Sequence, residues 1–329
     1  MGTNASDATL EMLPVERIER NPENPRLYFR PGELETLQHS IAQHGIQVPI
    51  NVYRKGSRYI LIDGERRWKC ALKLNLKKVP ALVQDEPSQL TNILLMFNIH
   101  ALREQWDLLT IAVKLPRVLA LLEKETGRPP VEQEIIDKTG LNRSAIRRCK
   151  LLIELPEMYR EQLLEELHKP KSQQKLTEDF FIEMERALKT CERAMPGLID
   201  NKNKARDIII KKYRNGVVKD LVDLRLLPRI AKAEKVGANT QLAASALQRI
   251  LSQNDYSIEA GYEDTVSWAY SERDIVQRIT TIVERLEDIE PDEMEADVLK
   301  ALRDLQKRIQ RLLGSVRRRT ASLANRCGH

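Results

Sequence analysis

The spacing of apolar residues predicts alternating helices and strands near the start of the chain. Between Pro31 and Gly45 apolar residues recur every three or four positions, which predicts a short amphipathic helix. From 46 to 62 two β-prone runs flank the turn sequence RKGS, which predicts a hairpin. A second short helix then precedes the strand VPALV at 79–83. This order of elements predicts a small domain that combines helices with a sheet.

Beyond about Ser88 the β signal disappears and helical spacing continues almost to the end of the chain. Residues 131–152 contain two short helices. The first stops at Gly140, and Asn142 caps the second, which starts near Arg143. Two short helices joined by a glycine-containing turn predict a helix-turn-helix.

Two heptad series of apolar residues mark the C-terminal part, and Pro291 separates them. The pattern predicts a helical hairpin or a pair of interface helices, because leucine and isoleucine at this spacing normally pack against another helix. The residues are Ile275, Ile279, Ile282, Leu286 and Ile289, then Val298, Leu302, Leu305, Ile309, Leu312 and Val316.

The predicted fold class is α+β, with a small mixed α/β domain, an all-α helix-turn-helix domain and a helical C-terminal region. A polar break, HKPKSQQKLTE at 168–178, suggests a linker or domain boundary. The predicted segments are a disordered leader at 1–12, the α/β domain at 13–88, the helix-turn-helix domain at 89–168, a linker at 169–179, helices at 180–265, oligomerisation helices at 266–316 and a basic tail at 317–329.

Composition narrows the classes of function. The 54 basic residues exceed the 48 acidic ones, giving a net charge of +6, which permits a polyanionic partner. No run of about eighteen apolar residues is present, and the first ten residues lack the pattern of a secretory signal. We therefore expect a cytoplasmic protein without a membrane partner. The four cysteines and five histidines show no metal-ligand spacing, which predicts reduced thiols and no metal site built by the protein alone.

The cluster DGERRWKCA at 63–71 carries the strongest candidate chemistry. Trp68, Ala71 and Leu72 give its second half a helical apolar face, so the cluster lies where a strand turns into a helix. Such a turn presents unpaired N–H groups and the positive end of the helix dipole, which favour an anion. The alternative is a solvated helix on which Glu65 pairs with Lys69 and the arginines are merely exposed.

Several separated motifs give this cluster a context. NPENPR at 21–26, the helix to Gly45, QVPI at 47–50 and DGERRWKCA follow one another in an order that resembles the ParB-like partition proteins. The matching residues are Asn21, Pro22, Pro25, Arg26, Gln47, Pro49, Ile50, Gly64, Glu65, Arg66, Arg67 and Ala71. The resemblance covers residues 15 to 160 well, residues 217 to 230 weakly, and the remainder hardly at all.

The resemblance implies a ParB/sulfiredoxin-type domain that binds a nucleoside triphosphate, CTP or ATP, with Mg²⁺. It places Glu65 near the phosphates as the candidate catalytic residue. It also offers Asn98 and Glu104 as metal contacts through the nucleotide. The implied nucleotide-binding residues are Arg26, Gln47, Gly64, Glu65, Arg66, Arg67, Asn98 and Arg103.

Two departures from the family pattern bear on activity. In FNIHALREQWD at 97–107, Phe97 replaces the acidic residue that helps to hold the metal in family members, which places magnesium-dependent hydrolysis in question. Cys70 lies further into the helix than the reactive cysteine of sulfiredoxins, so a sulfiredoxin activity is rejected.

The second predicted helix of the helix-turn-helix is the candidate DNA-binding element. The two-helix unit can turn Leu141, Ala145, Ile146, Cys149 and Leu152 inward, which leaves basic and hydroxyl groups on the outer side of the second helix, where a recognition helix meets the major groove. The alternative is a basic helix face in a bundle. The candidate DNA contacts are Arg143, Ser144, Arg147, Arg148 and Lys150.

These patterns together predict a nucleotide-gated clamp or switch that binds double-stranded DNA, in DNA partition or related regulation. We expect a homodimer associated with the nucleoid or a plasmid, with the C-terminal helices available to a protein partner. A CTPase activity stays open. The alternatives are a ParB-like metal-dependent nuclease, and a DNA-binding scaffold or transcription regulator that does not hydrolyse nucleotide.

Overall fold

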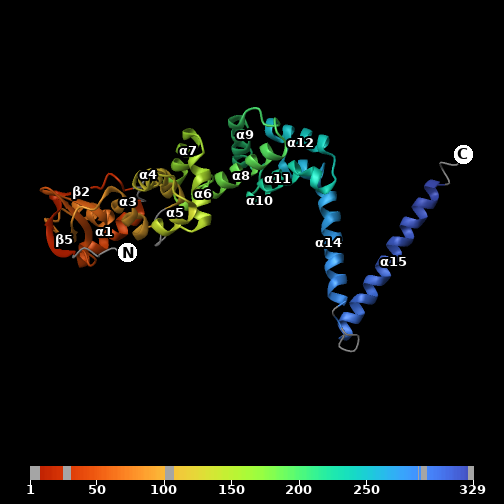
Figure 1. Ribbon diagram of the computed structural model, residues 1–329, viewed down its shortest axis with the longest axis horizontal. Helices are drawn as coiled ribbons and strands as arrows, with labels where there is room; N and C mark the ends of the chain where they lie inside the picture. The colour runs from red at the N-terminus through yellow and green to blue at the C-terminus, as the bar shows by residue number, and fades with distance from the viewer. Residues whose placement is uncertain (1–7, 25–30, 101–106, 288, 290–294, 325–329) are drawn as a thin grey trace.

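The structure is a computed structural model in which a small sheet domain leads into a run of helices and a long helical hairpin (Figure 1). It describes residues 8–24, 31–100, 107–287, 289 and 295–324. The predicted fold class is confirmed, because one five-stranded sheet near the N-terminus is followed by helical segments through the rest of the described chain.

The sheet has the strand order β1-β5-β3-β4-β2. The β1–β5 and β3–β4 pairs are antiparallel, whereas the β3–β5 and β2–β4 pairs are parallel. The predicted hairpin is confirmed, although its first strand begins only after Pro49 and its turn is Gly56–Ser57. The strands are β1 (Thr9–Pro14), β2 (Ile18–Glu19), β3 (Ile50–Lys55), β4 (Arg58–Asp63) and β5 (Lys78–Gln84).

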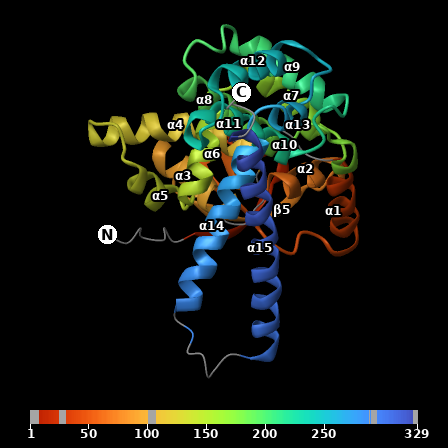
Figure 2. The same cartoon turned by 90° about the vertical axis from the view of Figure 1, so that its right-hand side faces the viewer.

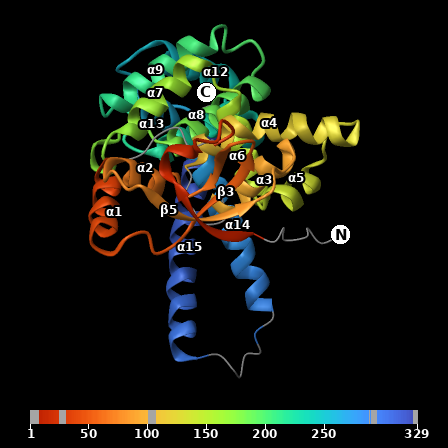
Figure 3. The same ribbon diagram turned by 90° about the vertical axis from the view of Figure 1, so that its left-hand side faces the viewer.

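Helices lie on both sides of the sheet (Figure 3). Helix α1 (Pro31–His44), which confirms the predicted amphipathic helix, packs beside α2 (Glu65–Lys73), and α2 contacts β3. Helix α3 (Gln89–His100) contacts β4 from the other side. Because successive strand residues face opposite sides, Leu61 packs in the core under α2, and Ile60 and Ile62 pack in the core with α3.

The predicted disordered leader at 1–12 is wrong for its second half. Residues Thr9–Pro14 form the edge strand β1, which pairs with β5 from Thr9↔Val83 to Pro14↔Lys78. The periodic signal of this strand is weak because Leu13 is buried, whereas Leu10 and Met12 are 66% and 58% exposed. Residues 1–7 lie outside the described part of the chain.

The apolar face predicted for α2 is partly wrong. Ala71 is buried and Trp68 is half-buried, as expected, but Leu72 is exposed. Cys70, which is 1% exposed, takes the buried position instead. Cys70 and Leu72 lie two positions apart, which is about 200° around a helix, so they face opposite sides of α2.

The helices that follow include the two that the sequence predicts at 131–152. Helix α5 ends at Gly140, whose φ of +71° suits a glycine C-cap, and the Asn142 side chain accepts the Ala145 N–H to cap α6. The bounds are α4 (Leu108–Thr126), α5 (Glu132–Thr139), α6 (Arg143–Ile153), α7 (Glu157–His168), α8 (Glu178–Ala194), α9 (Lys202–Arg214), α10 (Leu221–Leu224), α11 (Leu226–Ala231), α12 (Thr240–Ser252) and α13 (Ile258–Glu263).

The predicted linker at 169–179 is packed rather than open. It contains a short 3-10 turn, Lys171–Gln173, and its Leu176 is fully buried. The Lys175 N–H donates to the Glu166 carboxylate, and Glu178 already belongs to α8. One apolar cluster continues from the sheet side chain of Tyr53 through this connection to Val266, so no break in the core accompanies the polar sequence.

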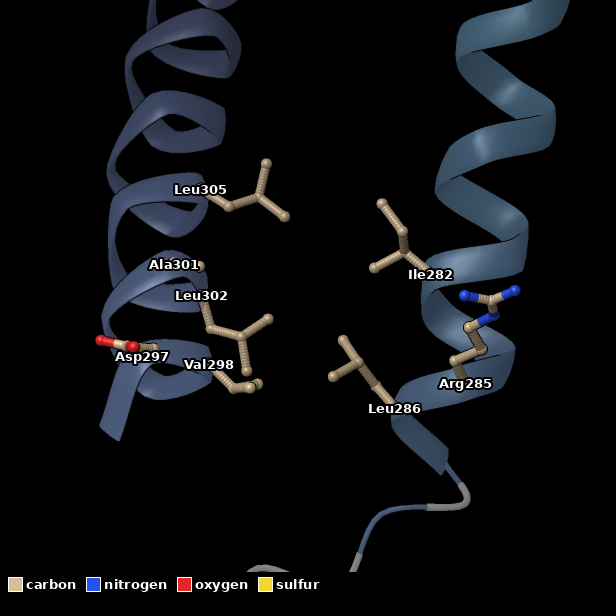
Figure 4. Close-up of a pocket in the computed structure, with 8 residues that line it drawn as sticks. All are labelled: Ile282, Arg285, Leu286, Asp297, Val298, Ala301, Leu302 and Leu305. Carbon is tan, nitrogen blue, oxygen red and sulfur yellow. The ribbon is translucent and has the colours of Figure 1, made fainter. Parts of the chain in front are cut away.

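A helical hairpin ends the described chain, as the heptad series predict. Helices α14 (Ser267–Glu287) and α15 (Ala296–Ala324) diverge from their connection like the arms of a V (Figure 1), and in the view turned by 90° they run nearly alongside one another (Figure 2). Near the vertex, side chains of the two seams point toward one another, among them Leu286 and Val298 (Figure 4). Pro291 lies outside the described residues.

The backbone of α15 continues to Ala324, so the part of the predicted basic tail that is described is helical. The described helices include none that is both long and apolar enough to cross a membrane.

Candidate functional site

The turn between β4 and α2 depends on a glycine for two reasons. Gly64 has φ +94° and ψ 19°, a left-handed conformation that other residues seldom adopt. A Cβ atom at this position would also lie 2.7 Å from Cγ2 of Ile50, the buried first residue of β3. The turn therefore sits directly on the sheet, with no room for a side chain.

Gly64 is the N-cap of α2, and it supplies no side-chain cap to the first turn. The amide N–H groups of that turn have no partner within the helix, and they coincide with the positive end of the helix dipole. Arg66 is half-buried in the same turn. The arrangement is suited to an anion whose oxygen atoms approach the backbone closely.

Arg67 holds neighbouring parts of the protein together. Its guanidinium donates to the backbone carbonyls of Val48 and Pro49, the latter at 2.6 Å, and pairs with Asp63 at 2.9 Å. These contacts anchor the QVPI segment to α2. The guanidinium N–H groups of Arg67 that could bind a phosphate are therefore already engaged within the protein. In this respect Arg67 differs from a side chain that serves only as a phosphate ligand.

Glu65 is 6% exposed and is surrounded by cations. Its Oε1 lies 3.0 Å from both Arg20 Nε and Lys69 Nζ, and its Oε2 accepts a hydrogen bond from the Asn24 side chain. The i,i+4 pair with Lys69 exists, but the carboxylate is buried and not part of a solvated face. This geometry orders the loop around Asn24 against α2.

The NPENPR motif also contacts the helices that follow the sheet. Asn21 is 1% exposed, and its side chain donates to Oδ1 of Asn92 on α3 at 2.9 Å. Glu23 lies 3.6 Å from Lys114 Nζ and 3.5 Å from Arg117 Nε, both on α4. The loop thereby joins α2, α3 and α4. Sequence reasoning missed Asn24, Asn92 and the Glu23 pairs, because no local pattern connects residues so far apart.

Two of the other predicted nucleotide-binding residues, Gln47 and Asn98, are exposed side chains on different segments. Gln47 is exposed and its amide donates to the His44 carbonyl at the end of α1. Asn98 is exposed on α3. Arg26, Arg103 and Glu104 lie outside the described residues.

The side chain of Phe97 is fully buried with Ile93 and Met96, where the family resemblance implies an acidic metal contact. Within the described residues no group of three His, Cys, Asp or Glu side chains could hold a metal. The described side chains therefore do not fit a magnesium ion held by the protein itself.

Cys70 has the properties of a packing residue. Its Sγ donates weakly to the Leu34 carbonyl at 3.6 Å, and burial, the largest effect, raises the pKa of the thiol. A raised pKa lowers the thiolate fraction on which cysteine reactivity depends.

Burial along α6 follows the pattern that the sequence predicts. Leu141, Ile146, Cys149 and Leu152 are buried, and Ala145 is half-buried, as the sequence predicts. On the outer side, Arg143, Ser144, Arg147 and Lys150 are exposed.

Acidic neighbours balance part of this face. Glu132 on α5 lies 3.1 Å from Arg143 Nε and 3.7 Å from Arg147 Nε, and Arg148 pairs with Asp179 of α8. Arg148 is thus directed toward α8, whereas Lys150 makes no ion pair among the salt bridges of the described chain.

Comparison with known proteins shows that the N-terminal part of the chain is similar to ParB proteins. Residues 1–99 match the family model of the ParB N-terminal domain. The chain is 35% identical over 150 residues to a probable chromosome-partitioning protein ParB of Pseudomonas putida, covering 45% of this chain and 49% of the relative. It is 42% identical over 84 residues to the chromosome-partitioning protein ParB of Myxococcus xanthus, covering 26% and 28%. The chain thus spans about half the length of the first relative and 28% of the second.

Solved structures of the Caulobacter crescentus chromosome-partitioning protein ParB, C-terminally truncated, are also similar. The complex with the centromeric parS site is 21% identical with a TM-score of 0.41, covering 68% of this chain and 98% of that chain. The complex with CTP-gamma-S is 24% identical with a TM-score of 0.28, covering 54% and 92%.

We expect Gly64→Ala to lower the free energy of unfolding by about 2–4 kcal/mol, because it combines left-handed strain with the contact to Ile50. Gly56→Ala is the matched control: its φ is +59°, but nothing lies within 4 Å of the added atom, so we expect a loss of about 1 kcal/mol. Urea denaturation of both variants measures the difference. Equal losses would show that the contact with Ile50 is unimportant.

Proposed function

We propose that this chain, whose residues 1–99 are a ParB N-terminal domain, binds a nucleoside triphosphate at the Gly64 turn and DNA through α6, and acts in DNA partition. The observation that carries the proposal is the convergence of three sequence motifs on the start of α2. Arg67 ties in Val48 and Pro49, and Glu65 ties in Asn24. Residues separated by more than forty positions are thus held around one uncapped helix start.

The ligand that fits this turn is a polyphosphate. Backbone N–H groups of the first turn of α2 would hold phosphate oxygens, with Gly64 allowing the close approach and Arg66 adding charge. Arg67 and Glu65 act as positioning residues, because their contacts fix the walls of the turn. CTP is the nucleotide that the motif resemblance implies, with ATP as the alternative. Phe97 has no atom that could bind a metal ion, so it contributes no contact to a metal that accompanies either nucleotide.

A nucleotide at this turn would bias the arrangement of the helices that follow. The loop of Asn21 to Asn24 contacts α2 through Glu65, α3 through Asn92 and α4 through the Glu23 pairs. A ligand shifts a conformational equilibrium only as far as it binds one arrangement better. The loop is placed to provide that difference, because any movement of it changes its contacts with three helices.

DNA binding is assigned to the outer face of α6. Its exposed cations, Arg143, Arg147 and Lys150, suit phosphate or guanine contacts, and Ser144 at the helix start suits a phosphate. The prediction of a helix-turn-helix supports this assignment, because the second helix of that motif is the one that enters the major groove.

Self-association is assigned to the hairpin of α14 and α15. In the single chain its seams are open: Ile275 is 53% exposed, Ile279 52%, Leu305 41% and Leu312 58%. A second copy would cover these rows and form a helical bundle. Two protomers joined in this way would place two DNA-binding helices in one assembly.

The nucleotide assignment predicts that Arg66→Ala weakens CTP binding by about ten-fold or more, because a charged phosphate contact contributes about 1.5–3 kcal/mol. Calorimetric titration with each of the four nucleoside triphosphates measures the effect and identifies the base. Arg58→Ala, which removes an exposed cation from β4, serves as the control and should bind normally. Unchanged CTP affinity in Arg66→Ala would exclude Arg66 as a ligand.

For DNA we expect Arg147→Ala and Lys150→Ala each to reduce the slope of log affinity against log salt by about one, if each side chain contacts a phosphate. Fluorescence anisotropy with a labelled duplex at several salt concentrations gives the slope. Lys204→Ala, an exposed cation on α9, should leave it unchanged. A slope that responds to Lys204 and not to the α6 residues would move the interface to α9.

The dimer assignment is tested by Ile279→Asp combined with Leu305→Asp. Wild-type protein should sediment at twice the chain mass of 38.0 kDa, and the double variant at the mass of one chain. The side chains are exposed in the single chain, so the fold itself should persist in circular dichroism. Thr280→Asp, a neighbour outside the apolar seam, should remain dimeric. A monomeric wild type, or a dimeric double variant, would contradict the assignment.

A further inference from the structure

The first turn of α4 is held from two other helices at once. The Leu109 N–H donates to Oε1 of Glu178, the first residue of α8, at 2.6 Å. The neighbouring Leu108 carbonyl accepts a weak hydrogen bond from Cys149 of α6, with the sulfur 3.9 Å away. Helix α4 also has its own N-cap, Asp107, whose carboxylate accepts the Thr110 N–H at 2.8 Å. Helices α4, α6 and α8 therefore meet at this one corner (Figure 1).

Two carboxylates at one helix start form an unusual cap, because one of them belongs to a distant part of the chain. Asp107 is local, whereas Glu178 is separated from Leu109 by 69 positions. The next residue of α8, Asp179, engages α6, since it pairs with Arg148. The first turn of α8 thereby connects the start of α4, through Glu178, to the helix that we assign to DNA, through Asp179.

The surroundings of Glu178 on balance oppose its ionisation. Burial, followed by Asp107 of α4 and Asp179 of its own helix, raises the pKa of Glu178 to about 7, although the Leu109 N–H and Arg148 of α6 act in the opposite direction. The protonated carboxyl keeps a carbonyl oxygen that can accept the Leu109 N–H, and it removes the repulsion between the carboxylates. The Leu109 hydrogen bond by itself favours the carboxylate, but burial of the charge and the neighbouring carboxylates outweigh it, so mild acid favours the closed arrangement and ionisation opposes it.

We propose that Glu178 is a latch between the nucleotide-binding and DNA-binding parts, which holds the start of α4 against α8 when protonated and loosens when ionised. The role as a coupler rests on the proposed function, because α4 follows directly after the segment FNIHALREQWD at 97–107 and receives the Glu23 pairs from the loop beside α2. A nucleotide-induced movement of α4 away from α8 would have to break the Leu109–Glu178 hydrogen bond.

Hydrogen exchange of the Leu109 amide in the full chain, without nucleotide or DNA, tests the latch directly. A group that binds its proton more tightly in the closed state stabilises that state less as pH rises. With a pKa of about 7 closed and the ordinary 4.5 open, protection corrected for intrinsic exchange should fall about ten-fold between pH 6 and pH 8. Glu178→Gln keeps the acceptor oxygen without the charge, so its protection should be high at both pH values.

Two further variants separate the latch from a purely structural contact. Glu178→Ala should lose protection at both pH values, and Glu157→Gln, an exposed carboxylate at the start of α7, should keep the wild-type ten-fold dependence. Loss of the pH dependence in Glu157→Gln, or its persistence in Glu178→Gln, would overturn the latch. Because this measurement contains no nucleotide, it stands if CTP binding fails.

The coupling is tested separately by CTP-induced release of a labelled DNA duplex at pH 8. Slower release from Glu178→Gln than from wild type supports the coupler. Equal rates in a protein that binds CTP would overturn it.

Discussion

The close approach of Gly64 to Ile50 is the constraint on which the rest of the N-terminal site depends. With 2.7 Å between the missing Cβ and Cγ2 of Ile50, the strand-to-helix turn lies against the first residue of β3, and α2 starts at the sheet surface. Only from that position can Arg67 reach the carbonyls of Val48 and Pro49, and Glu65 reach Asn24. The positive φ and the absence of a side chain thus determine where the uncapped N–H groups of α2 point.

Around this turn, polar side chains connect elements that the apolar core keeps apart. The sheet has separate apolar clusters on its two sides, one beneath α2 and one beneath α3. The Asn21–Asn92 pair is buried and crosses from the loop to α3, while Glu65 binds the loop to α2. A buried amide or carboxylate without its partner is costly, so these contacts specify one arrangement of the loop more strongly than apolar packing would.

Local periodicity accounted for much of the fold, and long-range contacts explain what it missed. The α1 helix, the hairpin of β3 and β4, and the buried face of α6 followed from spacing alone, because each buries a regular set of side chains. Strand β1 did not, since an edge strand with a single buried leucine has almost no periodic signal. The Gly64 turn was identified from its residue types, but the internal use of Arg67 depends on Val48 and Pro49, which lie on another element. The polar sequence at 169–179 suggested a domain boundary because most of its side chains are polar. A polar segment can still be packed against the core, however, and here the single buried side chain of Leu176 anchors it there.

The uninterrupted apolar cluster from Tyr53 to Val266 has a consequence for how the chain is made and broken down. A chain divided into independent globules can complete each one as it leaves the ribosome. Here the face of the sheet that packs against α3 shares one core with the helices up to α14. An unfinished chain therefore keeps apolar side chains uncovered until α8 to α13 have been synthesised. Shortened fragments that end between α7 and α8 would carry that same uncovered surface, and they would be natural targets for chaperones and proteases.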